Sequence, residues 1–288
     1  MSAPLAAYAR LVAFRHSIFA LPFALQGAWL GARGVPGWRE SAWIVVCAVS
    51  ARTAAMGFNR FVDRRIDALN PRTSARELPS GVLSPFEVAS LIVLSSAVFV
   101  AAAFALNGLC GRLSPVVLAI LFFYSFTKRF TAAAHAFLGL SLALAPLGAW
   151  LAVRGDFSGD LWIPVSLAAA VLAWVAGFDL IYACQDAEFD ARAGLHSVPS
   201  RFGVARALSL ARLLHVLTVA LLLVTWRRAD LGWIYALAIA LAALLLVYEH
   251  TLVAPDDLSR VDLAFFTLNG WVGVGLFVGL VLDFALAT

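Results

Sequence analysis

Charged side chains are scarce in this 288-residue chain. Only 13% of its residues are charged, whereas 62% are hydrophobic, and its mean hydropathy is +0.90. Soluble domains carry about 25% charged residues, so this shortage excludes an ordinary soluble protein and predicts a polytopic membrane protein. The polar stretches at 60–84 and 185–204 are too short to form a soluble domain. We therefore expect one membrane domain over residues 1–288.

Cysteine and concentrated positive charge are also lacking. The three cysteines, Cys47, Cys110 and Cys184, have no metal-ligand spacing, which argues against a disulfide framework and against a thiolate metal site. The net charge of +4 is spread over loops instead of gathered in one patch. Nucleic acid is therefore not expected as a partner, whereas the lipid bilayer is.

Long apolar runs dominate the rest of the chain. A run of roughly 20 apolar residues is needed to cross the hydrocarbon core of a membrane. The first run follows Arg10 and Arg15 as in a signal peptide, but no small-residue cleavage site ends it, so we interpret it as a helix. The sequence predicts an all-α bundle of nine transmembrane helices, at about 15–33, 40–60, 85–107, 113–127, 132–153, 161–184, 205–226, 229–249 and 262–286.

The distribution of basic residues predicts the orientation of this bundle. With the N-terminus inside, thirteen Lys and Arg residues fall on the cytoplasmic side and six on the opposite side. The positive-inside rule therefore favours a cytoplasmic N-terminus. We expect an integral protein of a prokaryotic inner membrane, with the loops at 60–84 and 185–204 on its cytoplasmic side.

The first of two acidic clusters closes the second apolar run. Asn59, Asp63 and Asp67 follow one another at four-residue intervals, so on a helix they fan over roughly 80° of one face. Carboxylate and amide oxygens are the ligands that hard divalent cations prefer. The spacing predicts that these side chains converge on one ion, and Mg²⁺ holding a diphosphate is the natural candidate.

A second cluster closes the sixth apolar run and comprises Asp179, Tyr182, Asp186 and Asp190. If it is helical, Asp179 and Asp186 are nearly eclipsed, with Asp190 one turn beyond. Four membrane crossings separate the two clusters. Both are therefore predicted to emerge on the same face of the membrane.

The alternative is that these acids are solvated and pair with neighbours in the chain, Asp63 with Arg64 and Asp190 with Arg192. That interpretation does not explain why acids at four-residue spacing recur at two equivalent helix ends. It also leaves Asp179 inside an apolar run, where an ionised group is costly without a partner. We therefore favour a shared site.

Basic side chains near the clusters are candidates for binding anions. Arg52 lies inside the second run, two turns before Asn59. It either compensates a carboxylate such as Asp179 or grips a substrate carboxylate or phosphate, for which its planar fork is suited. Lys128 and Arg129 either complement a diphosphate or only mark a cytoplasmic helix end.

Residues 51–73, which contain the first cluster, and residues 179–190, which contain the second, resemble the two Asp-rich signatures of the UbiA superfamily of intramembrane aromatic prenyltransferases. The likeness extends to residues 124–129 and, through the helix count, to nearly the whole chain. Residues 178–186 and 194–199 look most like the 4-hydroxybenzoate polyprenyltransferases and their relatives assigned to menaquinone synthesis by the futalosine route.

The resemblance implies a helical bundle whose central cavity binds a polyprenyl diphosphate through two Mg²⁺ ions. The implied activity is transfer of the polyprenyl group to 4-hydroxybenzoate or a related hydroxy-aromatic or naphthoate acid in ubiquinone or menaquinone biosynthesis. The ring proton would pass to the diphosphate or to an Asp such as Asp179. The implied metal ligands are Asn59, Asp63, Asp67, Asp186 and Asp190, with Asp179 and Tyr182 lining the same chamber.

The resemblance also implies which cations bind the substrates. Many members carry Asp directly after the motif Asn, whereas this chain has Arg60, which leaves one carboxylate fewer for the metals and one cation more for the diphosphate. The implied binding residues are Arg60, Arg72, Lys128 and Arg129 for the diphosphate, and Arg52, Arg15 and His16 for the carboxylate of the acceptor.

Two other functions stand as alternatives. A CDP-alcohol phosphotransferase also uses clustered Asp and a metal, but its Asp residues lie in one helical motif that is absent here. A secondary transporter places its acids near the centres of its spans, whereas most of the acids here lie at predicted cytoplasmic ends.

Overall fold

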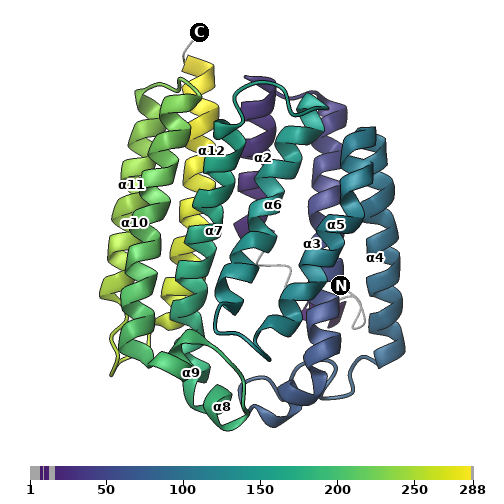
Figure 1. Ribbon diagram of the computed structural model, residues 1–288, viewed down its shortest axis with the longest axis vertical. Coiled ribbons are helices and arrows are strands. Elements are labelled where there is room, and N and C mark those ends of the chain that lie inside the picture. Colours follow the sequence, from purple (N-terminus) through teal and green to yellow (C-terminus); the bar gives the residue numbers. More distant parts are fainter. Residues whose placement is uncertain (1–6, 9, 13–16, 287–288) are drawn as a thin grey trace.

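The computed structural model describes residues 7–8, 10–12 and 17–286, and that part of the chain is helical, without β-strands. Eight of its helical segments are long and apolar enough to cross a membrane, and the apolar helix Phe19–Ala32 is shorter. Long helices run side by side as a bundle (Figure 1). They are α2 (Ser17–Ala32), α3 (Trp38–Leu69), α4 (Pro85–Leu106), α5 (Gly108–Thr127), α6 (Ala134–Arg154), α7 (Trp162–Ala183), α10 (Val204–Arg228), α11 (Trp233–Thr251) and α12 (Asn269–Leu286).

Local signals set the ends of the helices near the site. Pro71 follows Asn70, the C-cap of α3, and proline is poorly compatible with a continuing helix. The capping box between Ser84 and Glu87 begins α4. Helix α5 begins at Gly108, five residues earlier than predicted, because the Asn107 side chain accepts a hydrogen bond from the Cys110 N–H.

The second acidic cluster does not lie on one continuous α-helix, contrary to our expectation. Helix α7 ends at Ala183, a 3₁₀ turn η2 (Cys184–Asp186) follows, and the short helices α8 (Ala187–Arg192) and α9 (Val198–Phe202) complete the segment. A 3₁₀ turn has three residues per turn instead of 3.6, so the predicted near-eclipse of Asp179 and Asp186 does not apply.

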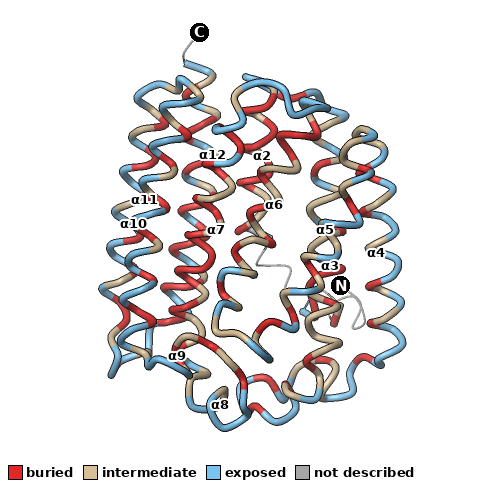
Figure 2. The backbone as a smooth tube through the Cα atoms, in the orientation of Figure 1, coloured by how far each residue is buried: buried red, intermediate tan, exposed pale blue. Residues whose placement is uncertain are grey.

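Helix α7 forms the centre of the core. Its residues are mostly buried along its length, whereas the outer faces of α4, α10 and α11 are largely exposed (Figure 2). Gly139 of α6 lies so close to the backbone of Leu172 on α7 that a Cβ atom would collide with it. Small residues at such contacts let membrane helices pack closely.

The loops that follow the two acidic clusters lie at the same end of the bundle. The segment between α3 and α4 meets α8 there, at the end of the bundle opposite the end of α12 (Figure 1). The two clusters therefore lie at the same end of the bundle, as an even number of crossings between them predicts. Helix α12 follows a π-helical turn, η3 (Leu263–Leu268).

Candidate active site

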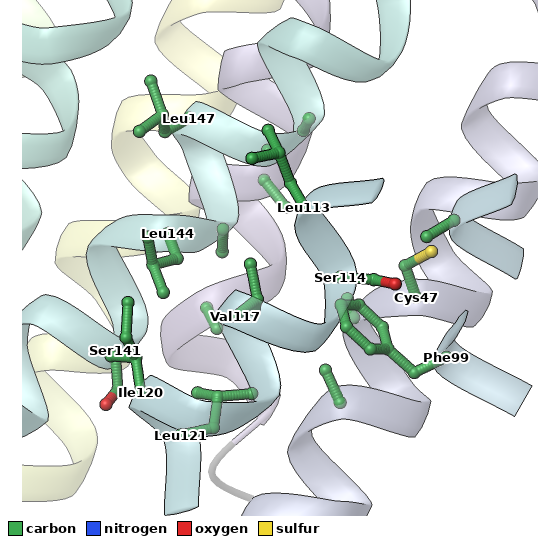
Figure 3. Close-up of a pocket in the computed structure, with 18 of the residues that line it drawn as sticks. Cys47, Phe99, Leu113, Ser114, Val117, Ile120, Leu121, Ser141, Leu144 and Leu147 are labelled. Atoms are coloured by element: carbon green, nitrogen blue, oxygen red, sulfur yellow. The ribbon is translucent and has the colours of Figure 1, made fainter. Parts of the chain in front are cut away.

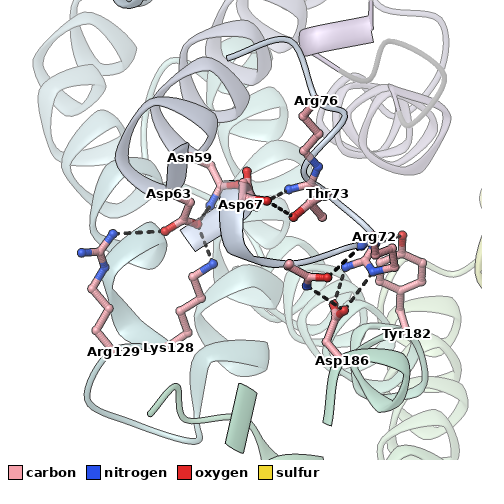
Figure 4. A network of polar contacts seen from close by, with 11 residues as sticks. Asn59, Asp63, Asp67, Arg72, Thr73, Arg76, Lys128, Arg129, Tyr182 and Asp186 are labelled. Atoms are coloured by element: carbon pink, nitrogen blue, oxygen red, sulfur yellow. Dashed lines mark hydrogen bonds and ion pairs between the residues drawn. The ribbon is translucent and has the colours of Figure 1, made fainter. Parts of the chain in front are cut away.

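The first cluster lies on the last turns of α3 and is largely buried. Asp63 is 1% exposed and Asp67 is 6% exposed. The Asn59 side chain donates a hydrogen bond from Nδ2 to Asp63 Oδ2 over 3.2 Å, as expected for residues one turn apart on a helix. The three side chains therefore share one face of α3 (Figure 4).

Asp63 is neutralised by two cations from the end of α5. Lys128 Nζ lies 2.6 Å from Asp63 Oδ2, and Arg129 Nη2 lies 3.1 Å from Asp63 Oδ1. Arg129 also donates to the carbonyl oxygen of Val62. Arg64 turns away and donates to the Phe61 carbonyl instead, so the alternative pairing of Asp63 with its neighbour in the chain is not formed.

Asp67 is held by the loop that follows α3. Arg76 Nη1 donates to Asp67 Oδ1 over 2.7 Å, and the Thr73 hydroxyl donates to the Asp67 carbonyl oxygen over 3.0 Å. Among the described residues, no group hydrogen-bonds the buried Asp67 Oδ2. Burying a carboxylate oxygen without a hydrogen-bond donor costs free energy, and a bound cation would remove that cost. Asp67 Oδ2 is therefore a candidate ligand atom for a cation.

The second cluster is bound to the same loop. Arg72 donates from Nε to Asp186 Oδ1 over 2.9 Å and contacts Asp186 Oδ2 through Nη2. It also donates to the Tyr182 hydroxyl over 2.9 Å, and its guanidinium lies over the Tyr182 ring. Asn70, at the C-cap of α3, donates to Asp186 Oδ1 over 3.1 Å. The two clusters therefore meet through residues 70–76 (Figure 4).

Arg72 stays charged in this arrangement. Burial lowers its pKa, but the hydrogen bond to Asp186 and the electrostatic interactions with Tyr182, Asp186 and Asp67 outweigh burial, so its pKa is raised above the ordinary value. Arg72 therefore interacts with the carboxylates of both clusters at once.

The remaining acids of the second cluster lie at different places. Asp190 is on α8, where the charges of Asp186 and Lys128 act on it. Its neighbour Arg192 pairs with Glu188 instead, in an exposed contact of 3.1 Å. Asp179, on α7, accepts a hydrogen bond of 2.7 Å from His135.

The donor chemistry of the site fits magnesium. Among the described residues, no three His, Cys, Asp or Glu side chains are grouped closely enough to hold an ion, and the carboxylates pair with Lys and Arg side chains instead. The carboxylates themselves are hard oxygen ligands, and Asp67 has a buried oxygen without a partner. The site is therefore a set of carboxylates paired with basic side chains.

An apolar cavity of about 370 Å³ begins next to these clusters. Arg52 and Met56 of α3 and Tyr124 of α5 line it, and Met56 lies one turn before Asn59. Tyr124 also interacts electrostatically with Asp63 and with Arg52, Arg60 and Asp179. Figure 3 shows the further lining, which is almost entirely apolar: Phe99, Leu113, Val117, Ile120, Leu121, Leu144 and Leu147 surround the space, with Cys47, Ser114 and Ser141.

The other predicted cations have varied surroundings. Arg60 is largely buried near Asp67, Arg76, Glu77 and Tyr124, and its Nε has no hydrogen-bond partner among the described residues. Arg15 and His16 lie outside the described residues.

Four residues that contribute to the site were not among the predicted site residues. Asn70 and Arg76 bind carboxylates from the loop after α3, Tyr124 lines the cavity, and His135 contacts Asp179. Asn70, directly before Pro71 and Arg72, could have been singled out as a helix C-cap. No sequence signal distinguishes His135 from a histidine buried in the core.

Comparison with known proteins identifies the family. The family model described as "UbiA prenyltransferase family" matches residues 20–271. A curated protein of Nitrosospira multiformis, named 4-hydroxybenzoate octaprenyltransferase, is 33% identical and covers 90% of this chain and 88% of its own length. A protein of the same name from Vibrio campbellii is 30% identical, with coverages of 96% and 97%.

Solved structures share the fold. The apo structure of a UbiA homologue from Aeropyrum pernix K1 is 35% identical and superposes with a TM-score of 0.84, covering 93% of this chain and 98% of that one. A UbiA homologue from Archaeoglobus fulgidus, solved with DMAPP and Mg²⁺ bound, is 20% identical, with a TM-score of 0.71 and coverages of 97% and 99%. The chain is thus a member of the UbiA prenyltransferase family.

Proposed function

We propose that this protein is a magnesium-dependent membrane enzyme that transfers a polyprenyl group from a polyprenyl diphosphate to an aromatic acid in quinone biosynthesis. The acceptor is 4-hydroxybenzoate or a related hydroxy-aromatic or naphthoate acid, as the names of the curated relatives support. One observation carries the proposal. The two acidic clusters are linked through residues 70–76, where Arg76 binds Asp67 and Arg72 binds Asp186, and they lie beside an apolar cavity.

The acidic side chains would hold the metal ions, and the positively charged side chains would hold the diphosphate of the donor. When bound, Mg²⁺ supplies positive charge that stabilises the leaving diphosphate. The proposed metal ligands are Asn59, Asp63, Asp67, Asp186 and Asp190, and the proposed diphosphate ligands are Arg60, Arg72, Lys128 and Arg129.

The basic side chains that neutralise the carboxylates in this structure are also the proposed diphosphate ligands. Lys128 and Arg129 bind Asp63, and Arg72 binds Asp186. These side chains are each about a third exposed, so they could contact a diphosphate if the carboxylates held Mg²⁺. Fixed cations at the point where the leaving group develops charge stabilise the transition state.

The cavity would hold the isoprenoid next to the bond that breaks. Its apolar lining excludes water, which would otherwise capture an allylic carbocation. The Tyr182 ring of the second cluster packs against Phe265, with the centroids 4.2 Å apart, and its face carries the guanidinium of Arg72.

The acceptor would enter at the end of the cavity nearest the clusters. Arg52 lines the cavity there, so its guanidinium is placed to pair with the acid group of the acceptor. The aromatic ring of the acceptor would then attack the prenyl cation, and the displaced ring proton would pass to the diphosphate or to Asp179.

We also propose the topology. The positive-inside rule supports a cytoplasmic N-terminus, and both acidic clusters lie at one end of the bundle, which would then face the cytoplasm. Water-soluble substrates would reach the site from that side.

The direct test uses purified protein in detergent with Mg²⁺, a radiolabelled polyprenyl diphosphate and a panel of hydroxybenzoates and naphthoates. We expect label to pass to at least one hydroxy-aromatic acid and transfer to stop when EDTA is added. If no acceptor on the panel received label, the proposed acceptor class would be rejected. Transfer that persists in EDTA would reject the metal.

A further inference from the structure

His135 is a buried polar residue that touches the proposed active site through another side chain. It lies on the first turn of α6, with its side chain 7% exposed. Its Nδ1 is 2.7 Å from Asp179 Oδ2 on α7. Asp179 belongs to the second acidic cluster, and the proposed function gives His135 no role.

The second ring nitrogen fixes the tautomer of His135. The backbone N–H of Val198 donates to His135 Nε2 over 3.4 Å. A backbone N–H is only a donor, so Nε2 is the acceptor and carries no proton. Nδ1 then carries the proton and donates it in the hydrogen bond to Asp179, which occupies Oδ2 of that carboxylate.

The second carboxylate oxygen of Asp179, Oδ1, is not used by His135. Among the described residues no hydrogen bond reaches Asp179 Oδ1, and the side chain is 23% exposed. Asp179 lies one turn before Tyr182 on α7, and the Tyr182 hydroxyl accepts a hydrogen bond from Arg72 of the site. A carboxylate oxygen at this place can accept a hydrogen bond from a hydroxyl group on the ring of an aromatic acid.

We propose that His135 is a positioning residue that holds Asp179 so that Oδ1 accepts a hydrogen bond from the hydroxyl group of the aromatic acceptor. This inference rests on the proposed function. His135 thereby selects hydroxylated acceptors over plain aromatic acids. The bond between Val198 and Nε2 is a separate contact that anchors the start of α9.

The two ring nitrogens can be tested separately. His135→Asn keeps a donor near the position of Nδ1 and loses the group at Nε2. His135→Gln keeps an acceptor near Nε2 and loses the donor at Nδ1, and His135→Leu loses both. We expect His135→Gln and His135→Leu to lower kcat/KM for 4-hydroxybenzoate by about 10-fold to 100-fold, because a hydrogen bond to an ionised group is lost.

The KM values separate a positioning role from a structural one. We expect the KM for the polyprenyl diphosphate to change by less than about twofold in all three variants, and His135→Asn to retain most of the wild-type kcat/KM for the acceptor. His215→Asn is the matched control. His215 is also buried, bonds His250 and the Trp174 carbonyl, and lies on α10. The His215→Asn variant should have the wild-type KM for the acceptor.

A binding measurement avoids the chemical step. Calorimetry without donor or metal compares 4-hydroxybenzoate with benzoate, which lacks the hydroxyl group. We expect wild type and His135→Asn to prefer 4-hydroxybenzoate, and His135→Gln and His135→Leu to lose that preference. Unchanged preference in His135→Gln and His135→Leu, or equal loss in His135→Asn and His135→Leu, would overturn the positioning role. A wild type that neither binds nor prenylates any hydroxy-aromatic acid would instead reject the proposed function, and this inference with it.

Discussion

Replacing Asp63 with Asn should separate the chemistry of the site from the stability of the fold. The Asp63 side chain is 2% exposed and lies between Lys128 and Arg129, whose side chains are 31% and 39% exposed. A fully buried ion pair costs about 3–5 kcal/mol to break, and an exposed pair less than about 1 kcal/mol. Because both cations can turn to solvent, we expect Asp63→Asn to lower the free energy of unfolding by only about 1–2 kcal/mol.

The effect on catalysis should be much larger. The variant keeps the shape of the side chain but loses a proposed metal ligand, which contributes several kcal/mol to transition-state stabilisation. A loss of about 3–4 kcal/mol corresponds to a fall in kcat/KM of about 10²–10³-fold. The assay is transfer of a radiolabelled polyprenyl group to 4-hydroxybenzoate at saturating Mg²⁺, with thermal unfolding in detergent measured on the same samples.

A matched control lies at the same end of the bundle. Glu188 on α8 is an acid in an ion pair with Arg192, but it is 88% exposed and contacts neither acidic cluster. Glu188→Gln should keep kcat/KM within about twofold of wild type, since exposed pairs contribute little. If Asp63→Asn were as active as Glu188→Gln, the assignment of Asp63 to the metal site would be refuted.

Three further predictions concern the diphosphate, the core and the cavity. Arg60→Met removes a buried guanidinium beside the first cluster, so it should raise the KM for the polyprenyl diphosphate about 10-fold in steady-state kinetics. An unchanged KM would show that Arg60 does not contact the donor. Asn269→Ala should lower the free energy of unfolding by about 2–4 kcal/mol, since Trp174 Nε1 and Glu249 Oε1 each lose a buried partner; an unchanged thermal transition would contradict this. Val117→Trp should fill the cavity and shift mass-spectrometric product profiles towards shorter prenyl chains, whereas an unaltered profile would place the isoprenoid elsewhere.

Much of the fold followed from the sequence because a membrane imposes simple rules. Apolar runs of the right length predicted the long helices, and an even number of crossings between the clusters placed both at one end. The four-residue spacing of Asn59, Asp63 and Asp67 predicted one shared face, since α3 continues as a regular helix to Leu69.

The parts that were not predicted depend on tertiary contacts. The 3₁₀ turn at Cys184–Asp186 changes the spacing of the second cluster, and no residue pattern in that segment announces it. The pairing of Arg76 with Asp67 depends on how the loop after α3 folds back. His135 reaches Asp179 only because α6 packs against α7, a contact that neither segment encodes alone.

The central claim is that the two acidic clusters act as one site, and a double-mutant cycle tests it most directly. Transfer by Asp63→Asn, by Asp186→Asn and by the double variant is measured at saturating Mg²⁺ and compared as kcat/KM. Residues that act as a unit are strongly non-additive, so we predict that the double variant loses far less activity than the product of the two single losses. Losses that multiply would contradict the account, because they would mean that the clusters work independently.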